Sequence, residues 1–274
     1  MPELPDVEGF RRVVADHGTG RRITSVRVDD PQVLRGVDPE KLAGTLTGLS
    51  LGEPERHGKW LAVPLSGDPV LLLHFGMTGA MVWDDGTSPA HAHDRVTFVL
   101  PDGELRFRDM RKLRGIWLAA DRPDADRLLA PLGPDALTVG REEFASAVRT
   151  RRRVKATLMD QSALAGLGNL LTDEICWRAG VHPRRSGDDL SEEELATLHR
   201  AMRRVLRGAI PTGRVPGRRT WLTGRREDPD PTCPRCGTRL SRGRVAGRTT
   251  VWCPRCQPEP PPRRGNGPRR STAR

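Results

Sequence analysis

The stretch that decides the fold of the C-terminal part is a pair of cysteine motifs, Cys233-Pro-Arg-Cys236 and Cys253-Pro-Arg-Cys256, with sixteen residues between them. Two Cys-x-x-Cys motifs at this spacing are typical of a tetrahedral Zn²⁺ site at one end of a β-hairpin. The alternative is two redox-active dithiols, but no thioredoxin-like βαβ pattern surrounds either pair. Four thiolate ligands leave no open position on the metal, so we expect one structural Zn²⁺ held by these four cysteines.

The hairpin predicted between the two Cys-x-x-Cys motifs is strongly basic. Its arginines are Arg239, Arg242, Arg244 and Arg248. Guanidinium groups bind phosphate oxygens well, so this hairpin is suited to contact a polyanion.

The whole chain is also basic, with 46 Lys+Arg against 35 Asp+Glu and a formal net charge of +11 over 274 residues. Residues 1–140 contain more acidic than basic side chains, so the entire excess lies in residues 141–274. A positive field of this kind favours a nucleic acid as partner, because release of counterions from phosphates drives binding. The alternative is a solvated surface that reflects an arginine-rich genome.

The sequence excludes a membrane protein and a secreted disulfide scaffold. Its longest apolar runs, such as residues 70–73, are far shorter than the roughly 18–20 residues that a membrane helix needs. The first twenty residues contain several Glu, Asp and Arg, unlike a signal peptide. We therefore expect a protein of the cytoplasm.

The N-terminal half has the pattern of a β-domain with one helix. Pro5 and Asp6 are typical helix-start residues, and the helix is expected to end at Gly18. Short β-type runs follow, with a hairpin signal at residues 101–103; the runs are 23–28, 60–65, 70–74, 95–100 and 104–107. Residues 1–121 are therefore predicted to form a β-sandwich or barrel with one helix.

The C-terminal half is predicted to be helical up to the zinc hairpin. Residues 122–140, rich in Pro and Asp, are interpreted as a linker. Helical periodicity covers 141–150, 154–161, 169–179 and 191–207, so we place a helical domain at 141–210. Ser191 and Glu194 have the spacing of a capping box. A loop and the zinc finger then occupy 211–257, and the Pro-, Arg- and Gly-rich residues 258–274 are predicted to be a disordered tail. The fold class is α+β multidomain.

The turn Gly166-Leu167-Gly168-Asn169 lies between two predicted helices. The glycines permit positive φ and close approach, and Asn169 is predicted to be the N-cap of the next helix. Free N–H groups at a helix N-terminus can bind a phosphate. An ordinary helical hairpin is the alternative.

Several motifs in order resemble the formamidopyrimidine-DNA glycosylase and endonuclease VIII family of bifunctional DNA repair enzymes. They are residues 2–8 (Pro-Glu-Leu-Pro-Asp-Val-Glu), 56–61, 74–79, 166–169, 173–174 and 248–257. The match spans residues 2–257. It implies a β-sandwich, a helix–two-turn–helix domain and a zinc finger, acting as a monomer on damaged double-stranded DNA at the bacterial nucleoid.

The resemblance assigns catalysis to Pro2, Glu3 and Lys59. Removal of Met1 would leave Pro2 with a secondary amine that attacks the sugar C1′ and forms a Schiff base. Glu3 would protonate the ring oxygen, and Lys59 would contact phosphate and assist the chemistry. Excision of an oxidised base followed by β,δ-elimination is the implied reaction. Without the other motifs, Pro2-Glu3 would simply begin a helix.

The resemblance also assigns DNA contacts. Asn169 and Arg248 would bind phosphates around the lesion, with Lys155 as a weaker candidate. Three side chains would fill the hole left by the everted base, namely Met77, Arg111 and Leu113. Met77 and Leu113 could instead be core residues. His74 is assigned to DNA binding, but it could be a strand histidine whose hydrogen bonds are made within the protein.

Two departures from the pattern of the family leave open which damaged base is excised. Leu113 replaces the Phe usual in the formamidopyrimidine branch, and Arg114 replaces a Gly. Residues 211–232 form a shorter segment than that branch's base-capping loop, although the opening Pro-Glu-Leu-Pro is typical of it. Oxidised purines and, as in endonuclease VIII, oxidised pyrimidines are therefore both candidates. A non-catalytic zinc-dependent DNA-binding protein of the same fold is the alternative function.

Overall fold

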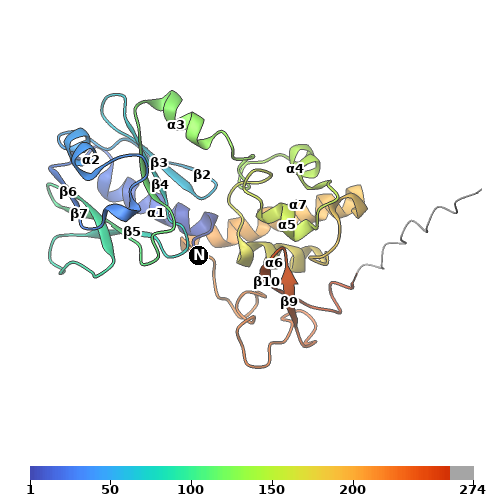
Figure 1. Ribbon diagram of the computed structural model, residues 1–274. Coiled ribbons are helices and arrows are strands. Elements are labelled where there is room, and N and C mark those ends of the chain that lie inside the picture. Colours follow the sequence, from blue (N-terminus) through green and yellow to red (C-terminus); the bar gives the residue numbers. More distant parts are fainter. Residues whose placement is uncertain (260–274) are drawn as a thin grey trace, which may run out of the picture.

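A computed structural model describes residues 1–259, which form a β lobe and a helical lobe that lie side by side (Figure 1). A two-stranded hairpin is attached to the helical lobe, and the N-terminus lies where the two lobes meet. The predicted tail, 258–274, lies outside the described residues except for its first two positions.

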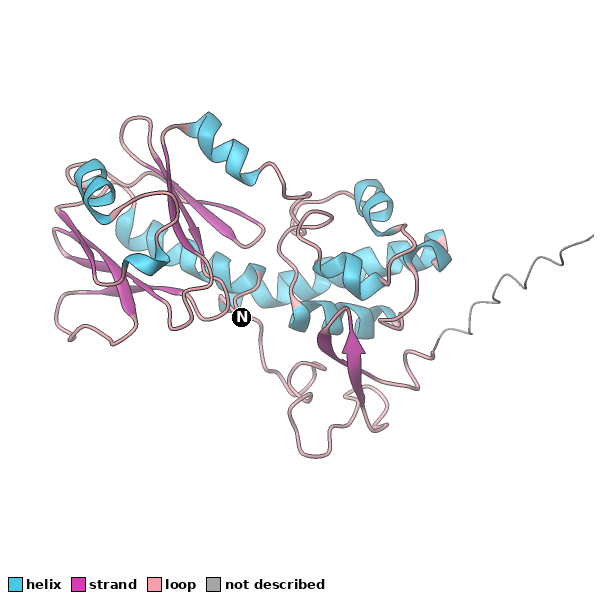
Figure 2. Ribbon diagram, viewed as in Figure 1, coloured by secondary structure: helices cyan, strands magenta, loops and turns pink. Residues whose placement is uncertain are grey.

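The β lobe is a sandwich of two antiparallel four-stranded sheets, drawn in magenta in Figure 2. One sheet has the order β1-β6-β7-β5 and the other β2-β3-β4-β8. The strands are β1 (Ser25–Val28), β2 (Glu55–His57), β3 (Trp60–Pro64), β4 (Val70–His74), β5 (Ala80–Asp84), β6 (Asp94–Leu100), β7 (Gly103–Arg108) and β8 (Gly115–Ala119). Leu, Val and Phe side chains from both sheets form one buried cluster. The predicted sandwich is confirmed, although β2, β5 and β8 were not predicted.

Helix α1 (Leu4–Gly18) links the two lobes. Leu4 is buried in the core of the helical lobe, whereas Val7, one turn later, is buried in the core of the β lobe. The first residues of the chain are therefore fixed at the boundary between the lobes.

The β lobe contains two more helices than predicted. Asp38 caps α2 (Pro39–Leu46) by accepting a 2.7 Å hydrogen bond from the Lys41 amide. Asp121 caps α3 (Arg122–Leu129) in the same way. The predicted linker 122–140 thus begins with a helix, whose buried Ala125 packs with residues of β3 and β4.

The helical lobe follows the predicted pattern closely. Its helices are α4 (Arg141–Val148), α5 (Val154–Met159), α6 (Asn169–Ala179) and α7 (Glu192–Ala209). The capping box at Ser191 and Glu194 is present. Short 3₁₀ turns occur at Pro31–Val33, Gly187–Asp189 and Ile210–Thr212. The predicted helical domain is confirmed, and its buried side chains form one core.

The C-terminal hairpin pairs β9 (Ser241–Val245) with β10 (Arg248–Trp252) in antiparallel register. Trp177 of α6 packs with Leu240 and Val251 of the hairpin region. The hairpin is therefore docked on α6.

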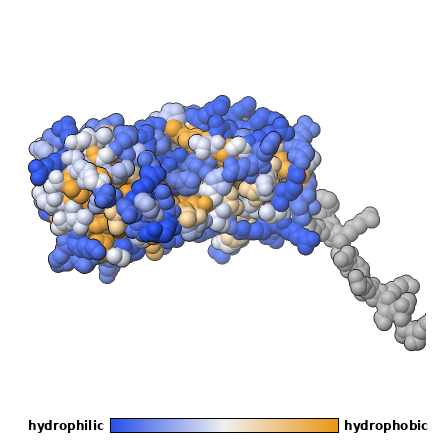
Figure 3. Space-filling view, turned by 90° about the horizontal axis from the view of Figure 1, so that it is seen from above, coloured by the Kyte–Doolittle hydropathy of each residue, from blue (hydrophilic) through white to orange (hydrophobic). Residues whose placement is uncertain are grey.

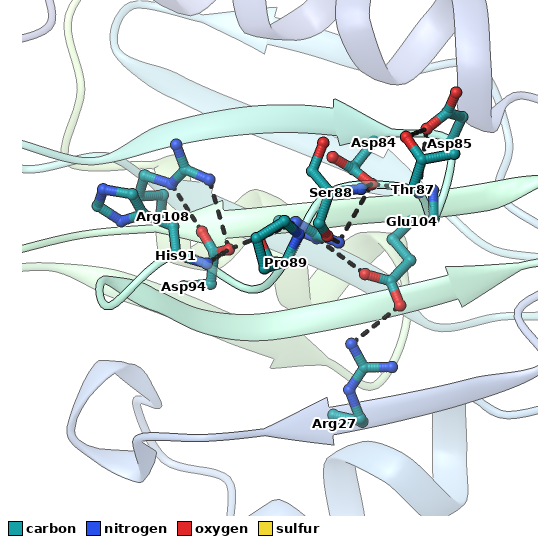
Figure 4. Close-up of polar contacts among 12 residues, drawn as sticks. Arg27, Asp84, Asp85, Thr87, Ser88, Pro89, His91, Asp94, Glu104 and Arg108 are labelled. Atoms are coloured by element: carbon teal, nitrogen blue, oxygen red, sulfur yellow. Dashed lines mark hydrogen bonds and ion pairs between the residues drawn. The ribbon is translucent and has the colours of Figure 1, made fainter.

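A polar network fixes the connection from β5 to β6 (Figure 4). Asp84 accepts the Gly86 amide at 2.8 Å, and Arg108 donates to Asp94 at 2.7 Å. Arg27 on β1 reaches Glu104 on β7 at 2.9 Å. Since these groups bind one another within the β lobe, this network is structural.

The face seen in Figure 3 is mostly hydrophilic, with scattered apolar patches. Among residues 1–259, no helix is long and apolar enough to cross a bilayer.

Candidate active site and DNA-binding surface

The carboxylate of Glu3 is buried at the N-terminus of α6 in the other lobe. It accepts hydrogen bonds from the amides of Gly168 (2.9 Å), Leu170 (2.8 Å) and Leu171 (3.0 Å). The first amides of a helix have no intrahelical acceptor and carry the positive end of the helix dipole. A carboxylate is therefore a natural partner for them.

This arrangement explains the glycine at position 168. A Cβ there would lie 2.3 Å from Cδ of Glu3, so any other residue would displace the carboxyl group. Gly168 is also the N-cap of α6, which makes the prediction of Asn169 as N-cap wrong. The expected phosphate seat is wrong for the same reason, because the amides of Gly168, Leu170 and Leu171 bind Glu3.

Lys59 lies in the tight turn between β2 and β3, which residues of the helical lobe hold in place. Asp135 accepts hydrogen bonds from the Gly58 amide (2.6 Å) and from Arg56 (2.5 Å). Gly58 has a φ of +58°, and a Cβ there would lie 2.7 Å from the Ala165 side chain. The Lys59 backbone is therefore positioned by contacts between the lobes.

Glu3 and Lys59 influence each other electrostatically. Burial raises the pKa of Glu3, an effect partly offset by the Lys59 ammonium and by the three amide hydrogen bonds. Burial lowers the pKa of Lys59, and Arg248 lowers it further, while Glu3 raises it. The site therefore contains a carboxyl that protonates more readily than usual and an amine that deprotonates more readily than usual.

A pocket of about 350 Å³ opens next to Pro2. Met77, Phe10 and Val215 give it an apolar lining, and Asp6 adds a carboxylate that accepts the Glu3 amide at 2.9 Å. Met1 precedes Pro2 in this chain and is 45% exposed. Removal of Met1 would leave the Pro2 amine in the pocket.

His74 ends β4 and is held in its neutral form. Its Nδ1 accepts the Gly76 amide at 3.0 Å, and its ring lies edge-on to Trp60. Burial, with the positive charges of Arg114 and Lys59, lowers its pKa to about 4. A DNA contact through His74 stays a prediction.

Lys155 is not available to phosphate, contrary to prediction. Its side chain is completely buried, and Nζ forms a 2.6 Å ion pair with Asp173. A second bond, at 3.3 Å, reaches the carbonyl of Thr249. The Lys155 ammonium therefore joins α5 to α6 and to β10 and stabilises their packing.

Arg248 and Asn169 lie near each other at the start of β10. The Asn169 Nδ2 donates to the carbonyl of Thr249 at 3.0 Å. Arg248 is exposed, and within residues 1–259 its guanidinium has no ion-pair partner. Arg248 is thus available to a ligand, whereas the Asn169 amide group already has a backbone partner. Phosphate binding by Arg248 and Asn169 stays a prediction.

Two of the three predicted hole-filling residues face each other. Nη1 of Arg111 lies 3.1 Å from Sδ of Met77. Leu113 is 50% exposed, and Met77 is only half-buried. The alternative that Met77 and Leu113 are core residues is therefore excluded.

The four predicted zinc ligands form one cluster, with their Sγ atoms within 4.8 Å of one another. All are free thiols. Amide hydrogen bonds support the sulfurs, from Arg235 to Cys233 and from Cys256 to Cys253, both at 3.4 Å. Such donors stabilise thiolates, so the site fits a structural Zn²⁺. Cys176 is separate and buried in the core of the helical lobe.

Family models match almost the entire described chain. The formamidopyrimidine-DNA glycosylase N-terminal domain matches residues 1–116, and the H2TH domain of the same enzyme matches residues 132–218. A zinc finger found in FPG and IleRS matches residues 231–258. The chain belongs to the formamidopyrimidine-DNA glycosylase family.

Full-length relatives support this assignment. The formamidopyrimidine-DNA glycosylase of Geobacillus kaustophilus is 37% identical over 94% of this chain and all of its own length. That of Salinispora arenicola is 36% identical over 95% of this chain and 97% of its own.

Solved structures of the family agree in fold. A complex of the Lactococcus lactis enzyme with an abasic site containing DNA superposes with a TM-score of 0.86 at 28% identity. A complex of that enzyme with Fapy-dG containing DNA gives 0.85 at 28% identity. Both comparisons cover 94% of this chain and all of the other.

Within this family fold, residues 211–232 are fastened to α6. Arg226 is buried and forms a 3.1 Å ion pair with Asp173, and the Thr223 amide donates to Glu174 at 3.2 Å. Asp173 and Glu174 belong to the motifs of the resemblance, but no role was predicted for them. The ion pair between Arg56 and Asp135 was not predicted, because nothing in the local sequence shows that residues 79 positions apart form an ion pair.

Proposed function

We propose that this protein is a bifunctional DNA glycosylase that removes oxidised bases from double-stranded DNA and cleaves the resulting abasic strand. The observation that carries the proposal is the placement of Glu3, buried beside Pro2 and within electrostatic reach of Lys59. Membership of the formamidopyrimidine-DNA glycosylase family supports it. We also infer action as a monomer in the bacterial cytoplasm, on nucleoid DNA.

Base excision begins at the Pro2 nitrogen. With Met1 removed, this secondary amine forms a bond to C1′ while the glycosidic C1′–N bond breaks and its electron pair leaves with the base. The proton that the amine loses passes to the departing base, which therefore leaves as a neutral molecule. An α-amino group has a pKa of about 7.7–8.0, so a neutral fraction exists near pH 7.

Glu3 acts on the sugar ring. As the C1′–O4′ bond breaks, its electron pair moves to O4′, which takes the proton of the Glu3 carboxyl. The product is an iminium at C1′. Burial favours the protonated form of Glu3, which is the form this step requires.

Strand cleavage follows from the iminium. Loss of a proton from C2′ expels the 3′ phosphate, and a second elimination expels the 5′ phosphate. Lys59 offers an ammonium to these phosphates, and its lowered pKa also suits it to proton transfer.

The helical lobe and the hairpin bind the backbone. Arg248 on β10 is exposed, and its charge lowers the pKa of Lys59, so it lies within electrostatic reach of this chemistry. A Zn²⁺ bound to Cys233, Cys236, Cys253 and Cys256 would hold together the two Cys-x-x-Cys motifs that flank the hairpin, and so stabilise its fold.

A panel of duplexes, each with a single lesion, tests the function. We expect release of a free base from a duplex with 8-oxoguanine, a ring-opened purine or an oxidised pyrimidine, and strand ends that both carry phosphate. Binding of an abasic duplex without cleavage would establish the non-catalytic alternative and overturn the proposal.

A further inference from the structure

We propose that Met110 is a second apolar wedge beside Leu113, on a loop that is fixed before DNA binds. This inference rests on the proposed function, since its ligand is the base stack of a damaged duplex. We call residues 109–114, between β7 and β8, the wedge loop.

Exposure points to Met110. In the part of the chain that the structure describes, four large hydrophobic side chains are exposed: Met1, Met110, Leu113 and Leu128. Two of the four, Met110 at 53% and Leu113 at 50%, lie in the wedge loop. Exposed apolar side chains concentrated in six residues indicate a contact surface.

Two arginines hold the backbone of the wedge loop. Nη2 of Arg35 donates to the carbonyls of Lys112 and Arg114, both at 2.9 Å. Nε of Arg95 donates to the carbonyl of Asp109 at 2.8 Å. Three carbonyls of one short loop are thus bound from outside it.

The Lys112 side chain holds the same loop from within. Lys112 has a φ of +53°, a conformation that residues other than glycine rarely adopt. Its Nζ forms an ion pair with Asp30 at 2.9 Å and a 2.6 Å hydrogen bond to Gln32. These contacts stabilise a turn that sets the directions of the residues on either side.

The wedge loop is also joined to the turn that carries Met77. Oδ1 of Asp109 accepts the Thr78 hydroxyl at 2.5 Å and the Arg111 amide at 3.0 Å. Met77 lines the pocket at Pro2 and contacts Arg111. The two turns therefore form one rigid unit at the edge of the pocket.

The chemistry of this unit suits an opened base stack. Apolar side chains such as Met and Leu can enter between base steps, while flanking arginines bind the partner base or phosphates. Met110 and Leu113 lie on either side of Arg111 and Lys112, so the loop offers an apolar contact at both ends. A preformed loop loses little conformational entropy on insertion.

Fluorescence of 2-aminopurine tests the role of Met110. The probe is a duplex with a tetrahydrofuran abasic analogue and 2-aminopurine next to the base opposite it, measured at saturating protein. We expect Met110→Ala and Met110→Gln to reduce the fluorescence change of the wild type by about twofold or more, and Met110→Leu to preserve it. Leu128→Ala, an equally apolar exposed change on α3, is the control and should match the wild type.

A fluorescence change in Met110→Ala equal to that of Leu128→Ala would overturn the wedge role. Borohydride trapping on an abasic duplex, run in parallel, keeps this failure separate from failure of the proposed function. If the wild type is trapped but the fluorescence change of Met110→Ala equals that of the control, only the wedge role of Met110 is contradicted.

The fixed loop has its own test. Arg35→Ala and Asp30→Asn should each reduce the fluorescence change at saturation, with melting temperatures showing that the protein is folded. Wild-type fluorescence from both variants would show that the loop needs neither contact and would refute its fixation.

Discussion

The amide of Gly168 donates a 2.9 Å hydrogen bond to the carboxylate of Glu3, so a residue next to the chain's N-terminus caps a helix of the other lobe. The same three amides that complete the N-terminus of α6 orient this carboxyl group. Positioning of the acid and docking of the lobes are therefore one interaction.

Gly168→Ala should strongly impair base excision. The new Cβ would lie 2.3 Å from the Glu3 carboxyl carbon, so Glu3 must move away from α6. We expect a loss of about 100-fold in single-turnover excision, in the range that general acid catalysis contributes. Gly44→Ala on α2 is the matched control, because its Cβ meets nothing within 4 Å. Excision by Gly168→Ala at the rate of Gly44→Ala would refute this role of Gly168.

Arg248→Ala should weaken binding to all duplexes alike. Arg248 is exposed and has no ion-pair partner among residues 1–259, so it is available to one phosphate. The slope of log K against log salt should fall by about 1 in magnitude. Lys41→Ala, an exposed cation on α2, should leave the slope unchanged. An unaltered slope in Arg248→Ala would remove Arg248 from the DNA contacts.

Lys155→Met should destabilise the fold without changing that salt slope. The substitution leaves Asp173 buried with only part of its positive surroundings, a change that costs about 3–5 kcal/mol. Denaturant unfolding measures the loss. A normal free energy of unfolding with a reduced slope would show that Lys155 binds phosphate after all.

His74 should make stability depend on pH on the acid side. Its pKa is lowered to about 4 in the folded protein, against 6.5 in the unfolded chain. The folded state therefore binds fewer protons between these values, and stability is lost as pH falls from about 6.5 to about 4, by about 3 kcal/mol. His74→Phe should lack this component. Titration of the His74 ring by NMR near 6.5 would contradict the prediction.

The sequence was most informative where local patterns suffice. The bounds of α6 and β4 were predicted to the residue, and the cysteine spacing predicted the zinc cluster. Helix α3 was missed because its Pro and Asp residues, which resemble a linker, serve as its N-terminal turn.

Contacts between distant residues could not be predicted. Lys59 and Lys155 both lie in motifs of the resemblance, yet Lys59 acts electrostatically on Glu3 whereas Lys155 forms an ion pair with Asp173. Only the folded chain shows that the amides on either side of Asn169, those of Gly168, Leu170 and Leu171, bind Glu3 and not phosphate. Where two lobes meet, a local motif identifies the residues but not their partners.

The most direct test of the account is borohydride trapping on an abasic duplex, with the adduct mapped by peptide mass spectrometry. The iminium at C1′ would be reduced to a stable amine, and we predict a DNA adduct on the N-terminal peptide that begins at Pro2. Glu3→Gln should trap far less, and a variant that retains a residue before Pro2 should trap none, because its Pro2 nitrogen is an amide. No adduct from the wild type, or an adduct mapped to another residue, would contradict the central claim.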